Sequence, residues 1–237
     1  MNILAFDTCF GACSAAVGIN MGRADQRIFS RCEPMEQGHV ARLLPMISDV
    51  IAEADVPLAG LELIAVTVGP GTFAGTRIGI AAAKGLGLAS GVRLAGVSSL
   101  ALIAAEAGPN NQHPHDICVT VDVRRGELYT QLFDPTGRIA RSAPALLTLT
   151  QARNLSENNG ITYVGSGANL VRDVERIDEN AALSFLAEPT FSNARFALDL
   201  LLHSQRSYNH HAHCAITPLY LRAPDAKPPT PSLLQRH

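Results

Sequence analysis

The residues best suited to chemistry lie in a glycine-rich stretch, GPGTFAGTRIG, which spans residues 69–79. It follows the apolar run LIAVTV and precedes a segment rich in Ala, Ile and Leu, so the sequence places it between a strand and a helix. A loop in that setting can hold a phosphate, because the free backbone N–H groups of a helix N-terminus attract anions. Whether this loop does so depends on the residues around its glycines.

Two phosphate-binding motifs can be compared with the stretch, and neither fits. A P-loop has Lys and then Ser or Thr directly after its last glycine, whereas Thr76 and Arg77 follow Gly75. The dinucleotide fingerprint has its third glycine three residues after the second, whereas Gly71 and Gly75 are four apart. The local pattern alone favours a tight turn before a helix, in which Pro70 restricts φ and the glycines adopt conformations that other residues resist.

Two aspartates occupy equivalent places in an internal repeat. The segments ILAFDTCFGACSAAVGINMGR and CVTVDVRRGELYTQLFDPTGR each predict a strand, a turn beginning at Asp, a strand, a glycine turn and a strand. Asp7 and Asp122 each precede a glycine by four residues and a Gly-Arg pair by fifteen. We interpret the match as a duplication at an offset of 115 residues. The two carboxylates can ligate magnesium in a kinase-like cleft, or they can cap their turns by accepting backbone hydrogen bonds.

Three other groups have structural interpretations beside the chemical ones. Cys9 is a candidate nucleophile, but no histidine accompanies it in sequence, and lone cysteines are mostly structural. The pair Arg124 and Arg125 can bind phosphate or RNA, although adjacent cations on a hairpin are usually solvated. The tract NHHAHC at residues 209–214 has a metal-binding composition, but it follows a helical pattern at 193–207, so we interpret it as a solvated loop.

Composition narrows the classes of function. The chain has 237 residues, 47% of them hydrophobic, and can bury a core of ordinary size as one large domain or two small ones. Its net charge of −2 disfavours unaided binding to tRNA or DNA, which usually needs a basic surplus. The N-terminus lacks the basic segment of a secretory signal peptide. Lys84 and Arg93 interrupt the apolar stretch after Gly79, which leaves it too short for a membrane span. Five scattered cysteines without a C-x-x-C pair predict reduced thiols. We expect a cytoplasmic protein without membrane contact.

Periodicity predicts alternating strands and helices. Short β-rich runs lie at residues 3–6, 14–19, 63–68 and 94–97, and helical patterns lie at 37–54 and 72–90. This alternation is typical of an α/β protein with a partly parallel sheet. The turn-forming stretch GPNNQHPHD predicts a boundary between two lobes, residues 1–107 and 116–222. The Pro-rich segment 223–237 predicts a mobile tail.

A duplicated α/β unit with an Asp-containing turn in each half resembles the actin-like ATPase (ribonuclease H-like) fold, with two lobes of mixed sheets flanked by helices. In that superfamily the two turns face one another and hold the phosphates of ATP with a metal ion. A closer resemblance, over nearly the whole chain, is to the TsaB family, also called YeaZ, whose glycine block is GPGSFTGxRIG. The segments that carry it are ILAFDT, HVARLLPMI, VTVGPGTFAGTRIGIAAAKGLG, VDVRRGELY and PLYLR.

The resemblance to the TsaB family implies a noncatalytic subunit that binds and supports the catalytic subunit TsaD. Together with the ATPase TsaE, these proteins transfer threonylcarbamoyl from threonylcarbamoyl-AMP to the adenosine beside the anticodon of certain tRNAs. It also implies a homodimer when the chain is alone, and contact with tRNA mainly through the assembled complex. The glycine loop then belongs to a fold that once served nucleotide binding. Its vestigial nucleotide-loop positions are Asp7, Thr8, Gly69, Gly71 and Asp122.

The catalytic relative holds a metal ion with an H-x-x-x-H pair on its first long helix, where residues four apart share one face. Here Leu43 follows His39 at that spacing, and Ala41 follows Gln37. A single imidazole cannot supply the several ligands of a catalytic metal site. We therefore expect no catalytic residue, no metal and no cofactor, and we interpret His39 as a capping or surface residue.

The two helices are the expected partner interface. The apolar arc of the first helix is wider than one stripe, and Gly75, Gly79 and Ala83 form a ridge of small residues on the second. Spacing alone is equally compatible with packing inside one chain, while the resemblance implies pairing with TsaD or with a second copy. The predicted interface residues are His39, Leu43, Met46, Val50, Gly75, Thr76, Gly79 and Ala83.

Three other functions remain open to the sequence. One is an ATP-binding kinase or ATPase that uses Asp7, Asp122 and the glycine loop. Another is a glycoprotease-like metallopeptidase, against which the missing second histidine argues. The third is a purely structural homodimer.

Overall fold

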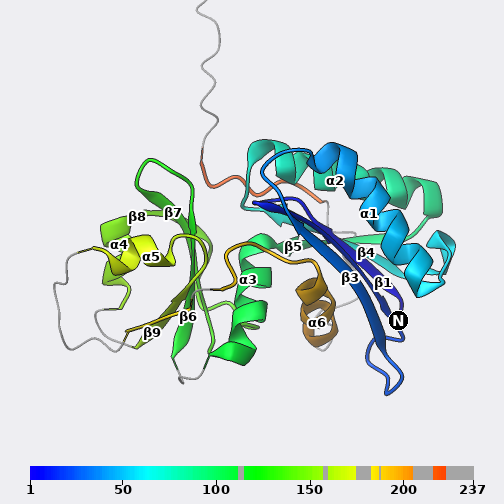
Figure 1. The fold of residues 1–237 in the computed structure, drawn as a ribbon. Helices are drawn as coiled ribbons and strands as arrows, with labels where there is room; N and C mark the ends of the chain where they lie inside the picture. Colours follow the sequence, from blue (N-terminus) through cyan, green and yellow to red (C-terminus); the bar gives the residue numbers. More distant parts are fainter. Residues whose placement is uncertain (112–114, 157–159, 175–182, 187, 205–215, 223–237) are drawn as a thin grey trace, which may run out of the picture.

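Two five-stranded sheets with the same topology form the framework of the chain (Figure 1). The computed structural model describes residues 1–111, 115–156, 160–174, 183–186, 188–204 and 216–222. The NHHAHC tract at 209–214 and the Pro-rich tail at 223–237, both of which the sequence analysis singled out, lie outside the described residues.

The first sheet has the order β3-β2-β1-β4-β5. Strand β1 is antiparallel to β2, β2 is antiparallel to β3, and β4 and β5 run parallel to β1. The bounds are Ile3–Asp7 for β1, Ala12–Ile19 for β2, Arg27–Pro34 for β3, Leu63–Gly69 for β4 and Arg93–Ser98 for β5. Each run that the periodicity predicted in this half is a strand.

The second sheet repeats this plan in the order β8-β7-β6-β9-β10. Its bounds are Asp116–Asp122 for β6, Glu127–Phe133 for β7, Ala145–Thr148 for β8, Ile161–Val164 for β9 and Leu183–Phe185 for β10. Strand β7 is antiparallel to both of its neighbours, β6 and β8, while β9 is parallel to β6 and β10 is parallel to β9. Asp7 and Asp122 end equivalent strands, β1 and β6. The shared topology confirms the predicted duplicated actin-like fold.

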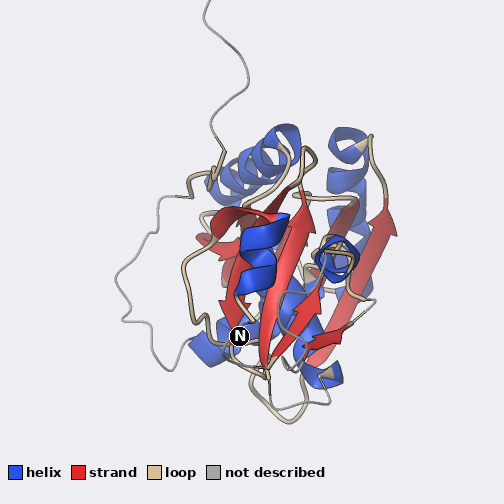
Figure 2. Ribbon diagram, turned by 90° about the vertical axis from the view of Figure 1, so that its left-hand side faces the viewer, coloured by secondary structure: helices blue, strands red, loops and turns tan. Residues whose placement is uncertain are grey.

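Helices cover both faces of the sheets. The long helices α1 (His39–Ala54) and α2 (Phe73–Ser90) pack on the outer face of the first sheet. The short helices α4 (Leu149–Asn154) and α5 (Ala168–Arg172) cover the outer face of the second sheet, and Figure 2 is viewed from that side. Two 3₁₀ turns, Leu58–Gly60 and Gly108–Asn110, complete the described helical segments. Among the described helices, none has the length and apolar character that a membrane crossing requires.

Two helices that lie between the sheets pack against the sheet of the other half of the chain. Helix α3 (Ser99–Ala107) comes from the first half of the chain, yet Leu100 and Ile103 pack with Ile117 and Val119 of the second sheet. Helix α6 (Arg195–Ser204) follows the second sheet in sequence, yet Leu198 packs on the first sheet. The predicted lobe boundaries group α6 with the second sheet. The tertiary packing instead interlocks the two halves through α3 and α6 (Figure 1).

Glycines in α2 separate into two kinds. Gly75 faces the turn after β1, and a Cβ there would overlap the carbonyl oxygen of Thr8. Gly85 is in the same helix, but an added Cβ would meet nothing within 4 Å. The first glycine is therefore required by a close approach of two backbones, while the second only lowers the helix propensity.

We expect opposite effects from one substitution at these two positions. Gly75→Ala should destabilise the fold by about 1–3 kcal/mol, because the methyl group overpacks the contact with Thr8. Gly85→Ala should stabilise it by up to about 1 kcal/mol through helix propensity. Urea unfolding measures both as shifts of the midpoint at constant slope. Equal effects at the two sites would contradict this assignment of Gly75.

Glu106 of α3 carries a buried carboxylate oxygen, Oε2, that has no hydrogen-bond partner among the described residues. Burial, together with the charge of Glu188, raises the pKa of Glu106 to about 7, although Arg195 at the start of α6 acts in the opposite direction. The protonated form is therefore favoured in the folded chain. This carboxyl couples the α3 region to pH.

Because the pKa of Glu106 is higher in the folded than in the unfolded chain, its contribution to stability is complete below about pH 4.5 and is lost as pH rises through about 7. The full loss is at most roughly 3 kcal/mol. Glu106→Gln does not titrate, so the difference in unfolding free energy between the variant and the native chain should grow across this window. Urea unfolding at several pH values measures it, and a constant difference would contradict the raised pKa.

Candidate functional site

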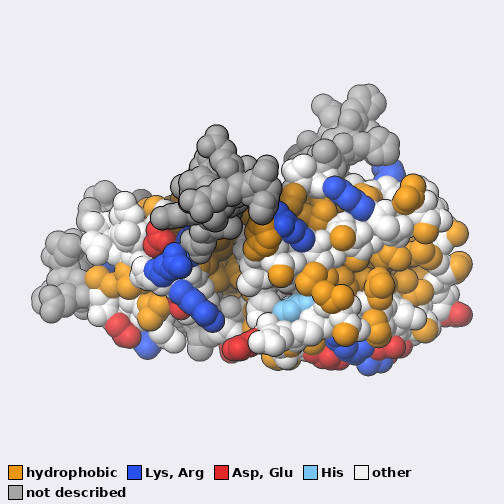
Figure 3. All heavy atoms as spheres, turned by 90° about the horizontal axis from the view of Figure 1, so that it is seen from above, with side chains coloured by type: hydrophobic (Ala, Val, Ile, Leu, Met, Phe, Trp, Pro, Cys, Tyr) orange, Lys and Arg blue, Asp and Glu red, His pale blue; other side chains and the backbone are white. Residues whose placement is uncertain are grey.

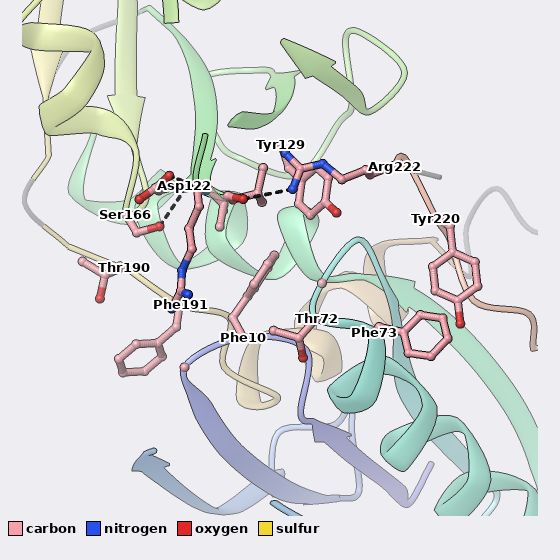
Figure 4. Close-up of a pocket in the computed structure, with 15 residues that line it drawn as sticks. Phe10, Thr72, Phe73, Asp122, Tyr129, Ser166, Thr190, Phe191, Tyr220 and Arg222 are labelled. Carbon is pink, nitrogen blue, oxygen red and sulfur yellow. Dashed lines mark hydrogen bonds between the residues drawn. The ribbon is translucent and has the colours of Figure 1, made fainter. Parts of the chain in front are cut away.

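A cleft of about 790 Å³ lies between the two halves of the molecule (Figure 4). The first half contributes Phe10 and Gly11 from the turn after β1, and Gly71 to Phe73 from the glycine loop and the start of α2. The second half contributes the β6–β7 hairpin, including Asp122 and Arg124. The cleft is thus where the duplicated Asp-containing turns approach one another, as the superfamily plan implies.

Asp122 reaches this cleft but uses its side chain locally. Its Oδ1 accepts a hydrogen bond of 2.8 Å from the backbone N–H of Arg124, and its own N–H donates to Ser166 Oγ at 3.1 Å (Figure 4). Arg124 and Arg125 both have positive φ, 66° and 61°, followed by Gly126 at 73°. The carboxylate therefore caps a tight left-handed turn, which confirms the capping interpretation.

Asp7, the equivalent residue, is withdrawn from the cleft. Its side chain is fully buried, and its Oδ1 accepts a hydrogen bond of 3.2 Å from the N–H of Cys9 and another from the Thr67 hydroxyl. Its Oδ2 accepts a hydrogen bond of 2.6 Å from Ser192. Burial raises the pKa of Asp7 above its usual value, although these hydrogen bonds act in the opposite direction. Asp7 joins β1, β4 and the segment before α6, and does not line the cleft.

The remaining loop positions also serve packing. Thr8 is buried and donates a hydrogen bond of 2.7 Å to the carbonyl of Gly75. A Cβ on Gly69, whose φ is 105°, would lie 2.9 Å from the carbonyl oxygen of Leu219. A Cβ on Gly71 would lie 2.6 Å from that of Cys9. The loop is glycine-rich because two backbone segments, the turn at Thr8 and Cys9 and the chain at Leu219, crowd against it. Of the five predicted nucleotide-loop positions, Gly71 and Asp122 line the cleft, whereas Asp7, Thr8 and Gly69 are buried.

Cys9 is a structural thiol. It is fully buried, and its Sγ donates a hydrogen bond of 3.2 Å to the Thr67 hydroxyl. Burial raises the pKa of this thiol far above its usual value, and the nearby charge of Asp7 raises it further. The thiol therefore stays protonated, and a protonated thiol is a poor nucleophile. The four cysteines within the described residues are all free, as the sequence predicted for them.

His39 is neither exposed nor a cap, so the interpretation from sequence was wrong. It is the first residue of α1, it is buried, and its Nε2 lies 3.2 Å from the carbonyl oxygen of Phe10. The N-cap is Gly38, which has a left-handed φ of 94° and no capping side chain. His39 fixes the start of α1 to the turn after β1. Within the described residues, no group of three or more His, Cys, Asp or Glu side chains is placed to hold a metal ion.

The predicted interface residues are all buried within the chain. Leu43, Met46 and Val50 belong to the core beneath α1. Gly75 and Gly79 face the turn after β1, where a Cβ would meet Thr8. The ridge of small residues on α2 therefore allows the helix to approach the sheet. Packing within one chain, which spacing alone left open, accounts for these positions. The full set is His39, Leu43, Met46, Val50, Gly75, Thr76, Gly79 and Ala83.

Other apolar residues of the same helices are exposed. On α1 they are Val40 and Leu44, which are 71% and 54% exposed. On α2 they are Phe73 and Leu88, which are 50% and 90% exposed. Figure 3 shows hydrophobic side chains gathered over this side of the first half. The wide apolar arc of α1 thus does extend to the surface, as the sequence predicted, but through different residues.

Comparison with known proteins identifies the family. A family model described as TsaD, tRNA N6-adenosine threonylcarbamoyltransferase, matches residues 33–193. The structure titled YeaZ from Pseudomonas aeruginosa superposes with a TM-score of 0.74 at 26% identity, covering 93% of this chain and 99% of that one. The chain belongs to the TsaB (YeaZ) family.

Two relatives named "tRNA threonylcarbamoyladenosine biosynthesis protein TsaB" show the extent of the similarity. The TsaB protein of Escherichia coli K12 is 38% identical over 129 residues, which are 54% of this chain and 53% of that relative. The match thus spans about half of each protein. The TsaB protein of Buchnera aphidicola subsp. Baizongia pistaciae is 27% identical over 231 residues, 92% of this chain and 97% of that relative.

Sequence reasoning missed the role of the segment Ile216–Arg222, although its PLYLR motif was recognised as a family feature. Tyr220 and Arg222 line the cleft. Arg77 of α2 lies with its guanidinium carbon 3.4 Å from the centre of the Phe73 ring and donates a hydrogen bond of 2.8 Å to Tyr220 Oη. The spacing of 143 residues between Arg77 and Tyr220 gives no local signal for this contact.

The buried position of Asp7 predicts a structural penalty for its loss. Asp7→Ala should destabilise the fold by about 1–3 kcal/mol, because the donors on Cys9, Thr67 and Ser192 lose their common acceptor. Asp7→Asn should cost less, since its carbonyl oxygen still accepts at the Oδ1 position. Thermal and urea unfolding measure both. A stability unchanged by Asp7→Ala would contradict the structural role.

Proposed function

We propose that this chain is a noncatalytic subunit of tRNA threonylcarbamoylation, which binds and supports a TsaD-type catalytic subunit. The modified position is the adenosine next to the anticodon. Membership of the TsaB family supports the pathway, since the relatives carry the name of threonylcarbamoyladenosine biosynthesis. In the assembled complex the chain works with a TsaE-type ATPase and contacts tRNA mainly through its partners. Alone it self-associates as a homodimer.

The noncatalytic assignment rests on the surroundings of His39 and Asp7, the two residues that a metal-dependent or kinase-like mechanism would use. Leu43 stands where a second histidine would complete a metal-binding pair, and His39 is engaged with the carbonyl of Phe10. Asp7, which a kinase-like mechanism would need at the phosphates, is buried against Thr67 and Ser192. These residues hold backbone segments together. They are not arranged to activate water or to position a phosphoryl group.

The exposed apolar surface of α1 and α2 is the observation that carries the partner assignment. We define this partner surface by Val40, Leu44, Phe73 and Leu88, the large apolar side chains that the two helices expose. Exposed patches of this kind commonly mark protein–protein contacts in soluble proteins. The helices are anchored to the sheet by buried side chains on their opposite faces, so the surface is rigid before a partner arrives. The same surface accounts for self-association when the catalytic subunit is absent.

The proposal predicts that single charges on the partner surface break the complex. Leu44→Glu and Leu88→Glu should each weaken binding to a TsaD-type subunit by roughly tenfold or more, because a carboxylate is then desolvated at an apolar contact. Both side chains are exposed, so the variants should remain folded. Analytical ultracentrifugation of the mixture and isothermal titration calorimetry measure the affinity.

Ile139→Glu is the matched control, since Ile139 is 60% exposed but lies beyond β7 in the second half. It should bind like the native chain. Failure of the folded native chain to form any complex with the TsaD-type subunit would overturn the proposal. Equal weakening by all three substitutions would show that the contact lies elsewhere.

A further inference from the structure

The segment Ile216–Arg222, which we call the strap, contacts both halves of the molecule. Its first residue, Ile216, is buried in the core of the first half beneath α1 and α2. Leu221, five residues on, packs with the core cluster of α3 and the second sheet. In Figure 1 the strap runs above α3, between the ends of α2 and β7. One short segment therefore joins the two cores on the cleft side.

The attachment to the first half is made by backbone and ring contacts. Leu219 donates a backbone hydrogen bond of 2.7 Å to the carbonyl of Val68 at the end of β4. The ring of Tyr220 stacks on Phe73 with centroids 5.7 Å apart, and its hydroxyl accepts from Arg77. Gly69 leaves room for the strap, since a Cβ there would press on Leu219. This end of the strap is held by several independent contacts.

Two side chains attach the strap to the second half, Arg222 and the partly buried Leu221. Arg222 donates a hydrogen bond of 3.2 Å from Nη1 to the carbonyl of Val123 (Figure 4), and its Nη2 pairs with Glu127. The Arg222 and Glu127 side chains are 24% and 36% exposed, so water weakens this ion pair. Ile216, at the other end of the strap, is buried in an apolar core. Leu221 is only partly buried. The Arg222 end is therefore the weaker of the two.

We propose that the strap is a latch between the lobes, which sets how far the cleft opens and releases at Arg222. Helices α3 and α6 join the two sheets through apolar packing and act as the fixed side of the hinge. The cleft lies where the strap crosses, so the lobes separate there only when Arg222 leaves Val123 and Glu127. Phe73 and Arg77 bind the other end, and Phe73 also belongs to the partner surface. The strap therefore connects that surface to the width of the cleft.

The test measures the distance between the lobes within one chain, with the labelled protein diluted in unlabelled protein so that label pairs across a homodimer do not contribute. Spin labels are placed at two exposed helix positions, Ser48→Cys on α1 and Asn169→Cys on α5, in a Cys32→Ser and Cys214→Ser background. The other cysteines are buried and should not react. Double electron–electron resonance then gives the distance distribution for the chain with Arg222 and for the Arg222→Met variant. The variant should show a broader distribution shifted to longer distances.

Glu127→Gln provides a second variant, which weakens the same latch from the other lobe and should shift the distribution in the same direction. Arg141→Met is the matched control, because it removes an exposed ion pair with Asp116 inside the second half and should leave the distances unchanged. Far-UV circular dichroism and thermal unfolding establish that each variant is folded. Unchanged distances in folded Arg222→Met and Glu127→Gln would overturn the proposal, as would an equal shift in Arg141→Met.

Discussion

The structure depends on the close approach between the N-terminus of α2 and the turn after β1. Gly75 lies against the Thr8 carbonyl, Thr8 donates its hydroxyl back to Gly75, and Thr72 caps the helix through the Gly75 N–H. Any side chain at position 75 would force these backbones apart. This contact positions the glycine loop and the start of α2, and the strap in turn packs on Gly69 and Phe73 of these two segments.

Duplication supplied two equivalent aspartates, and the packing around them made the two different. Asp122 ends β6 at the open mouth of the cleft, where it caps a hairpin of three consecutive residues with positive φ. Asp7 ends β1 beneath the segment that leads into α6, and Ser192 closes over it. The segment that leads into α6 thus covers one turn, while the other stays exposed. A site that needs both carboxylates in the cleft cannot form in this arrangement.

The helices α1 and α2 divide their residues between two tasks. Their inner faces use Leu43, Met46 and the small residues of α2 to fit closely on the sheet. Their outer faces retain large apolar side chains such as Leu44 and Leu88. A rigid apolar surface of this kind fits a protein partner, because little conformational entropy is lost when it is covered. The strap ends beside it, at Phe73, so the surface and the cleft share one structural element.

The sequence by itself determined the strands of the first half, the two long helices, the duplication and the family. Those features are local or repeated, so hydrophobic period, turn residues and motif spacing are sufficient to reveal them. It also identified the capping of Asp122, because an aspartate reaching the N–H two residues on is a local interaction. The tertiary structure alone decided which face of each helix is buried. When apolar residues cover a wide arc of a helix, their spacing does not indicate which of them point to the sheet and which to the surface. It also decided that Asp7 is sequestered by a serine 185 residues away, and that Tyr220 meets Arg77 across 143 residues. Contacts at such separations leave no periodic signal in one sequence, because they are fixed only when the sheets and helices pack.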